Sequence, residues 1–300
     1  VVATSPQFFC AIGGWLLSIF KWRPFVFELR DLWPASILAV SAMKSGGLIW
    51  LLERIELFLY RRASVVVSVT QSFREDLVSR GVDRKKIHVV INGVDLERYH
   101  PQRRDAALAK EFGLEEGFVA GYIGTHGMAH ALPKVLEAAE LLRHRSDIRF
   151  LFAGSGAERA RVEQLVAERG LTNVRLIPRQ PKGMMPALWS LCDVSIVPLL
   201  DNPTFATVIP SKIFESMGMG VPIVMSLPEG EATDIVRSTG VGVCVPPENP
   251  EAMAKAIAKL ADDPEEMANL RKNSFGSAPR FSREALAREM ARILEIAAGN

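Results

Sequence analysis

The chain has 300 residues, and at about 150 residues per domain this length predicts two domains. It carries 36 Lys and Arg against 34 Asp and Glu, and this near balance argues against a nucleic-acid-binding protein. Hydrophobic residues make up 48% and charged residues 23% of the chain, which excludes an intrinsically disordered protein.

The first apolar segment, residues 8–20, contains no charge and is interrupted by Gly13 and Gly14. A transmembrane helix needs about 20 apolar residues, so this shorter run predicts a buried helix. The chain begins at Val1 without a recognisable signal peptide, and we expect that a preceding segment has been cut away.

Residues 48–60 predict an amphipathic helix with a basic end at Arg61 and Arg62. Residues 1–62 hold seven basic and four acidic side chains. The helix either packs on a sheet or rests on an anionic membrane with its arginines near the lipid headgroups.

Short runs of Val, Ile, Leu and Phe alternate with segments of helical spacing. Near-continuous apolar runs are typical of strands buried on both faces of a parallel sheet. The predicted strands are residues 24–29, 64–70, 87–91, 118–124, 148–153, 174–177, 193–199, 222–225 and 241–245. The later predicted helices are residues 133–145, 157–169, 184–191, 211–217 (closed by Gly218), 250–261 and 264–272. This alternation predicts a doubly wound α/β fold, in which ligands bind at the carboxyl ends of the strands.

A charged, poorly periodic segment at residues 101–117 predicts a linker. We therefore expect a first domain at residues 1–100, which holds only about half of a doubly wound domain, and a second at residues 118–275. Residues 276–300 predict a final helix. The three cysteines, Cys10, Cys192 and Cys244, are scattered among apolar neighbours without a CxxC motif. We expect them to be buried thiols rather than zinc ligands or disulfides.

The loop at residues 124–130 (GTHGMAH) follows a predicted strand and precedes a helix. Glycines in this position let backbone N–H groups approach an anion, which the helix N-terminus also favours. His126 and His130 stand four residues apart, but a metal ion would need further ligands, and none is apparent. Either at least one histidine faces a phosphate, or both have a structural or surface role.

The segment at residues 204–222 is the richest in chemistry. Pro210 and Ser211 suit the start of a helix. Lys212 and Glu215 share one face of that helix, and a cation in a first turn opposes the helix dipole unless an anion is bound there. The pair is either a surface ion pair or a site for a phosphate and a ribose diol. Glu231, at the start of a later helix, is either a helix cap or a donor contact.

These residues resemble the family-4 retaining glycosyltransferases of the GT-B fold over nearly the whole chain. The resemblance rests on residues 24–34 (PFVFELRDLWP), 92–95 (NGVD), 124–132, 210–215 (PSKIFE) and 281–284 (FSRE). It is strongest to bacterial transferases of O-antigen and colanic-acid assembly, of L-fucosamine and fucose type. It implies an α/β protein of two Rossmann-like domains with the active site in the cleft between them. The last helix would return to the first domain, and full members are longer at the N-terminus.

The resemblance also assigns roles to residues. Glu215 corresponds to the second glutamate of a Glu-x7-Glu motif and would bind the ribose, whereas Thr207 stands in place of the first. Thr125 and His130 stand where the family commonly has Arg and Lys. The expected catalytic residues are Lys212, Glu215, Asp31 and Arg30. The expected donor-binding residues are Gly124, Thr125, His126, Gly127, His130, Arg179, Thr207, Ser211 and Glu231.

Arg30 and Asp31 would contact the acceptor or the donor sugar, with a local ion pair as the alternative. The implied function is transfer of a sugar, with retention, from a nucleotide-diphospho-sugar to a polyprenyl-diphosphate-linked saccharide in cell-surface polysaccharide assembly. A UDP-sugar, such as an N-acetylated deoxysugar, is the favoured donor. We expect no metal, no cofactor and no nucleic acid, and a cytoplasmic enzyme peripheral on the inner face of the membrane. The alternatives are a nucleotide-sugar 2-epimerase and a non-catalytic nucleotide-sugar-binding partner in an assembly complex.

Overall fold

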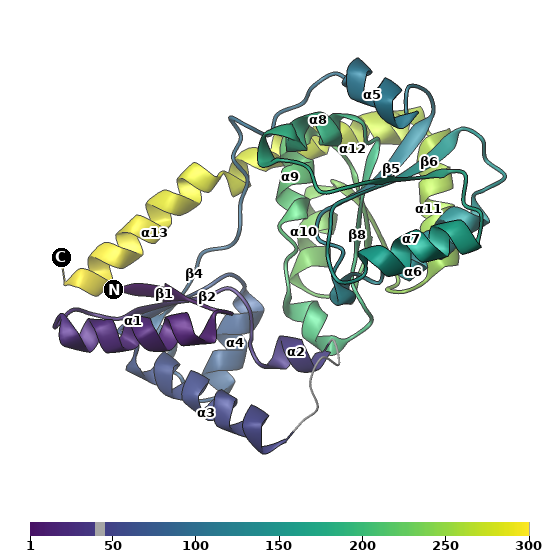
Figure 1. Ribbon diagram of the computed structural model, residues 1–300. Helices are drawn as coiled ribbons and strands as arrows, with labels where there is room; N and C mark the ends of the chain where they lie inside the picture. The colour runs from purple at the N-terminus through teal and green to yellow at the C-terminus, as the bar shows by residue number, and fades with distance from the viewer. Residues whose placement is uncertain (40–45, 300) are drawn as a thin grey trace. The chain divides into compact units, whose positions relative to one another are not determined.

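The computed structural model describes residues 1–39 and 46–299 (Figure 1). Contacts divide the chain into two compact units. Unit 1 consists of Val1–Asn92, Thr207–Ile209 and the C-terminal segment from Arg283, and unit 2 consists of Gly93–Ala206 and Pro210–Ser282. Each unit is built on a parallel sheet with helices packed on it, as the alternation of the sequence predicted.

Unit 1 contains a sheet of order β1-β2-β3-β4. Its strands are β1 (Val2–Thr4), β2 (Val26–Leu29), β3 (Val65–Ser68) and β4 (Ile87–Val89). Its helices are α1 (Phe8–Phe20), α2 (Ala35–Ala39), α3 (Gly47–Arg62), α4 (Gln71–Ser79) and α13 (Arg283–Ala298). Alternate residues of a strand point to opposite faces of the sheet, so its two faces have separate cores.

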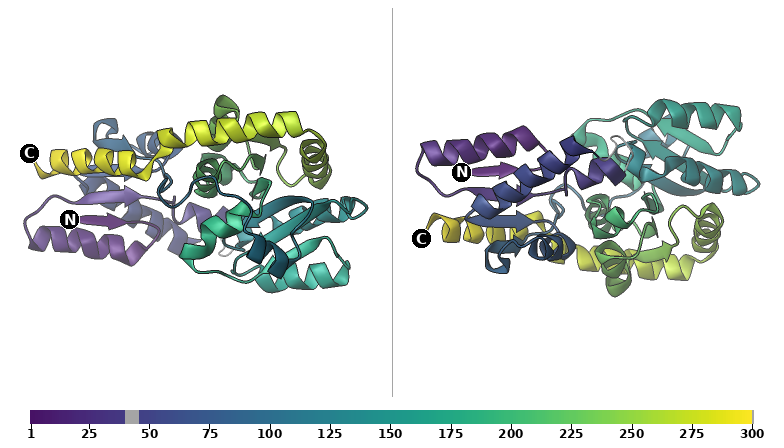
Figure 2. Two further views of the ribbon diagram at one scale, coloured as in Figure 1. Left: turned by 90° about the horizontal axis from the view of Figure 1, so that it is seen from above. Right: turned by 90° about the horizontal axis from the view of Figure 1, so that it is seen from below.

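The two faces are covered by different helices. Phe27 and Val66 pack with Tyr60 of α3 and Phe73 of α4. On the other face Val26, Val65 and Val67 pack with Ile293 of α13. Seen from above, strand β1 lies between α13 and α1 (Figure 2, left). The last helix of the chain thus completes the core of unit 1.

Unit 2 contains a sheet of order β10-β9-β8-β5-β6-β7. Its strands are β5 (Phe118–Ile123), β6 (Ile148–Ala153), β7 (Val174–Ile177), β8 (Val194–Pro198), β9 (Ile223–Ser226) and β10 (Gly242–Val245). Its helices are α5 (Ala106–Phe112), α6 (Leu132–Leu141), α7 (Arg159–Glu168), α8 (Met185–Ser190), α9 (Lys212–Met219), α10 (Glu231–Thr239), α11 (Pro250–Asp262) and α12 (Pro264–Ser277). The chain proceeds from β5 to one edge of the sheet and returns to build the other side from β8, so the strand order reverses beside β5.

Four local features differ from the sequence expectations. Helix α5 lies within the segment expected to be a linker, and this segment belongs to unit 2, because Asp105 caps the helix and Leu108 and Leu114 are buried.

Helix α9 does not stop at Gly218. A Cβ there would lie 2.9 Å from the carbonyl oxygen of Tyr99, so the glycine serves close packing, and Gly220, at φ +68°, ends the helix.

Helix α1 forms where the apolar run predicted it, but it is not a buried helix. Phe9 and Phe20 are 84% and 87% exposed, and only Ala11 and Ser18 are buried along its length. Cys10 is also exposed, contrary to the expectation of three buried thiols, because it lies on this same helix. Cys192 is buried, and Cys244 is partly buried.

Candidate functional site

A pocket of about 690 Å³ opens at the carboxyl ends of three neighbouring strands of unit 2. It is lined by residues 123–125 at the end of β5, 153–156 at the end of β6 and 179–182 after β7, together with Met185 and Leu188 of α8. Carboxyl strand ends at a reversal of strand order are where open parallel sheets bind ligands. The structure therefore brings Gly124, Thr125 and Arg179 of the predicted donor site to one pocket.

The loops after β5 and β6 form one backbone framework. The N–H of Gly124 donates to the carbonyl oxygen of Ala153, and the N–H of His126 donates to that of Ser155, both at 2.9 Å. Gly154 has φ +148°, and a Cβ on it would lie 1.8 Å from the carbonyl oxygen of Gly124. Only glycine allows this approach. Gly154 directly follows the strand predicted at residues 148–153, but no function was predicted for it. A second glycine-containing loop after a strand was the sequence signal that could have identified it.

Lys212 lies directly behind the first glycine of this framework. It is the first residue of α9 and is only 9% exposed. A Cβ on Gly124 would lie 3.2 Å from Lys212 Nζ, and this nitrogen has no hydrogen-bond partner among the residues that the structure describes. Burial lowers the pKa of Lys212 to about 7, although the charge of Glu215 opposes this shift. An unsatisfied buried ammonium is costly unless an anion reaches it.

Both histidines of the first loop surround the ring of Tyr122, at centroid distances of 5.6 Å for His126 and 5.9 Å for His130. His126 is fully buried, and within residues 1–39 and 46–299 neither of its ring nitrogens has a hydrogen-bond partner. Burial, with repulsion from Arg159 and Lys212, lowers its pKa to about 4. Burial and the charge of Lys212 lower the pKa of His130 to about 3. Both rings are neutral at pH 7, so neither offers a phosphate a positive charge.

The other predicted donor residues occupy separate positions. Glu215 is partly buried on α9, near enough for its charge to act on Lys212. Ser211 is exposed, and in the described chain its hydroxyl caps no N–H of α9. Thr207 groups with unit 1, apart from the lining of the pocket. Gly127 packs beside His130.

Glu231 begins α10, but Thr233 provides the side chain that caps this helix. The N–H of Gly230 donates to the Thr233 hydroxyl at 3.0 Å, and this hydroxyl donates to the carbonyl oxygen of Gly230 at 2.7 Å. The capping role that was one alternative for Glu231 is therefore performed by Thr233, two residues further along the helix.

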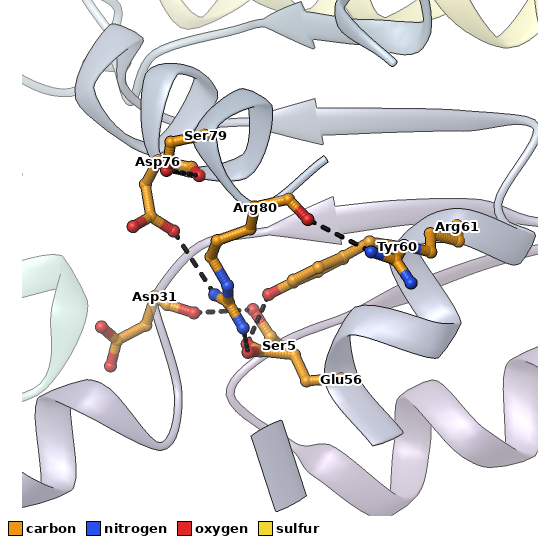
Figure 3. Close-up of polar contacts among 8 residues, drawn as sticks. All are labelled: Ser5, Asp31, Glu56, Tyr60, Arg61, Asp76, Ser79 and Arg80. Atoms are coloured by element: carbon orange, nitrogen blue, oxygen red, sulfur yellow. Dashed lines mark hydrogen bonds and ion pairs between the residues drawn. The ribbon is translucent and has the colours of Figure 1, made fainter. Parts of the chain in front are cut away.

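In unit 1, Arg30 and Asp31 follow the carboxyl end of β2. The Ser5 hydroxyl donates to the carbonyl oxygen of Asp31 at 3.1 Å (Figure 3). The same hydroxyl accepts a hydrogen bond from the N–H of Arg30 at 3.2 Å, so Ser5 stabilises this turn. No ion pair joins Arg30 to Asp31 in the described part of the chain. Burial raises the pKa of Asp31, and hydrogen bonds with Ser36 and Leu32 oppose this.

A polar cluster that the sequence did not predict lies between α3 and α4. Glu56 is 4% exposed, accepts a hydrogen bond from the Tyr60 hydroxyl, and pairs with Arg80 at 3.2 Å. Arg80 also pairs with Asp76 at 3.3 Å (Figure 3). Burial raises the pKa of Glu56 to about 7. Its charged members Glu56, Asp76 and Arg80 line a smaller pocket of about 270 Å³ together with Trp33. No motif signals it, because its members come from helices that only the fold brings together.

None of the described helices is long and apolar enough to cross a membrane. Outside residues 40–45 and 300, no group of three or more His, Cys, Asp or Glu side chains is arranged to hold a metal ion.

The sequence matches two families of known proteins. Residues 104–276 match the family described as "Glycosyl transferases group 1", and residues 2–98 match "Glycosyltransferase Family 4". The chain is 26% identical over 265 residues to the "Putative colanic acid biosynthesis glycosyl transferase WcaI" of Escherichia coli (strain K12), a match that covers 86% of this chain and 65% of the relative. It is 25% identical to the "Probable glycosyltransferase WbjE" of Pseudomonas aeruginosa, covering 87% of this chain and 63% of that protein. The chain thus spans just under two thirds of the length of these curated relatives.

A solved structure shares the fold. The crystal structure of Alr3699/HepE from Anabaena, in complex with UDP and glucose, has a TM-score of 0.82 and 20% sequence identity, and the match covers 98% of this chain and 77% of that one. The expected α/β architecture of GT-B type is therefore confirmed.

Proposed function

This chain belongs to the group 1 glycosyl transferases, and from that premise we propose that it is part of a retaining glycosyltransferase that takes its sugar from a nucleotide-diphospho-sugar. The observation that carries the proposal is Lys212, a buried ammonium without a hydrogen-bond partner in the described chain, immediately behind Gly124 of the strand-end pocket. A diphosphate bound at the glycine framework would supply the missing anion.

A uridine nucleotide is the donor base that we favour. The structural neighbour from Anabaena is described in complex with UDP and glucose, and with UDP-glucose. Arg179 lines the same pocket in unit 2 and would lie near the base. We propose that Glu215 binds the ribose diol, because a carboxylate can accept both hydroxyl protons at once. The transferred sugar that we favour is an N-acetylated deoxysugar.

The proposed reaction breaks the bond between the anomeric carbon and the diphosphate oxygen. A bond from the acceptor oxygen to the same face of that carbon replaces it, and the departing phosphate takes the acceptor proton. Negative charge grows on the nucleoside diphosphate during this step. Lys212 and the N–H groups of the glycine framework would stabilise it electrostatically. This scheme requires no metal ion and no protein base.

The proposed acceptor is a saccharide on a polyprenyl diphosphate. Relatives of the chain carry names from colanic acid and teichuronic acid biosynthesis, and surface polysaccharides of this kind are our proposed product, with O-antigen as one example. Arg30 and Asp31, at the strand end of unit 1, would contact the acceptor or the sugar. We also propose that the protein is cytoplasmic and binds peripherally to the inner face of the membrane through α1 and α3.

Calorimetric titration tests the donor site. UDP is expected to bind saturably and more tightly than GDP or ADP. Glu215→Ala should weaken UDP binding at least tenfold (about 1.4 kcal/mol), whereas Glu265→Ala, an exposed glutamate in the first turn of α12, should leave it unchanged. Absence of UDP binding by a folded chain would reject the donor-site assignment. Sugar transfer by the intact protein then separates a transferase from a non-catalytic binding partner.

A further inference from the structure

Tyr122 connects the two parts of the proposed diphosphate site. Lys212 Nζ lies 3.6 Å from the centroid of the Tyr122 ring, close enough for the ring face to attract a cation. At the other end of the same side chain, the hydroxyl donates to the carbonyl oxygen of Thr125. Tyr122 is fully buried, so its side chain is fixed by packing.

We propose that Tyr122 is a positioning residue of the donor site: its hydroxyl fixes the turn after β5, and its ring holds the Lys212 ammonium beside that turn until the donor diphosphate becomes its partner. This inference rests on the proposed function. It adds a residue that the sequence did not single out, and it gives the resting lysine a defined partner in the absence of an anion.

The charges around Lys212 determine how binding depends on pH. The groups that face it are Tyr122 from β5, the two loop histidines, and Glu215 from its own helix. The lowered pKa values of the histidines, about 4 and about 3, keep both rings neutral above pH 6. The guanidinium of Arg159 also acts on His126 and contributes to lowering the pKa of that ring. The pKa of Lys212 therefore lies near neutral pH, whereas the pKa values of the two histidines lie well below it.

A diphosphate binds the ammonium form of Lys212 in preference to the neutral amine. Below pH 7 the lysine is already charged, and binding needs no further proton. Above pH 7 the site must take up a proton when the ligand binds, so affinity should fall by up to tenfold per pH unit. Lys212→Arg remains charged throughout and reports the pH dependence of UDP itself.

The experiment measures UDP affinity between pH 6 and pH 9 by calorimetry. In the wild type we expect affinity to decline with a midpoint near pH 7, and in Lys212→Arg we expect no decline above pH 7. Tyr122→Phe retains the ring and should keep the midpoint while lowering affinity a few-fold. Tyr122→Leu removes the attraction between ring and cation, so its midpoint should move to lower pH by at least half a unit.

Phe150→Leu is the matched control, because Phe150 is a fully buried aromatic residue on the neighbouring strand β6. It should reduce stability but leave the midpoint in place. An unchanged midpoint in folded Tyr122→Leu overturns the inference. If that variant does not fold, a decline in Lys212→Arg equal to that of the wild type overturns it. Absence of UDP binding in the wild type at every pH would instead reject the proposed function.

Discussion

At the scale of single residues, some side chains of the candidate sites could be predicted from a sequence motif, whereas others could be found only from their burial in the structure. Lys212 and Glu215 were predicted from their spacing on one helix. Tyr122 and Glu56 carry no sequence signal, because a buried tyrosine or glutamate has the same local pattern as any other residue of its strand or helix. Burial shifts the pKa values of Lys212 and Glu56 toward neutrality from opposite directions.

Glu56 should make the stability of the protein depend on pH. Its pKa in the folded chain, about 7, is above the ordinary value of 4.5, so its contribution to stability is fully present below pH 4.5 and is lost as pH rises toward 7. A shift of this size corresponds to about 3 kcal/mol. Relative to Glu56→Gln, the wild type should therefore lose stability between pH 5 and pH 8.

Urea unfolding at the two pH values measures this change. Glu53→Gln, on the same helix, is the control for loss of one negative charge from α3. A difference between wild type and Glu56→Gln that stays constant from pH 5 to pH 8 would contradict the prediction.

At the scale of elements, α1 and α3 form an exposed apolar surface. We define the α1/α3 surface by side chains that are largely exposed, namely Phe9, Phe20, Trp22, Leu48, Trp50 and Leu51. The two helices contact one another through Trp15 and Phe58, whose ring centroids are 5.0 Å apart. Arg54 lies over Trp50 at 5.2 Å, so a basic group accompanies the aromatic ring. Exposed tryptophans beside arginines are typical of proteins that rest at a lipid interface.

The α1/α3 surface should bind anionic vesicles. We expect the protein to co-sediment with phosphatidylglycerol vesicles at low salt and much less with phosphatidylcholine vesicles. Replacing both Trp22 and Trp50 by Ser should reduce binding at least tenfold. The control is Phe275→Ser, an exposed aromatic of unit 2 with 54% exposure. Equal binding by the double variant and the wild type would reject this surface as the lipid contact.

At the scale of the whole molecule, each of the two units contains an apolar core and a pocket. Every residue that lines the larger pocket, together with Lys212 and Tyr122, belongs to unit 2. The large apolar core around Phe150 and Ile196 also lies entirely within that unit. Unit 1 also depends on α13, which is distant in sequence and packs Ile293 against the sheet of that unit.

A fragment of residues 93–282 is therefore expected to fold alone and to bind UDP. Its affinity should lie within about threefold of that of the full chain, a difference below 1 kcal/mol. Circular dichroism and calorimetry check the two parts of this prediction. A folded fragment that does not bind UDP would show that unit 1 contributes to donor binding.

The sequence by itself determined the alternation of strands and helices, the glycine loop at Gly124, and the helix that carries Lys212 and Glu215. These features follow from local periodicity and turn chemistry, which the order of residues encodes directly. Tertiary structure alone decided that Tyr122 lies under Lys212, that residues 101–117 pack on unit 2, and that Glu56 meets Arg80. Each of these depends on burial and on contacts between elements that are separate along the chain, and local pattern does not record them.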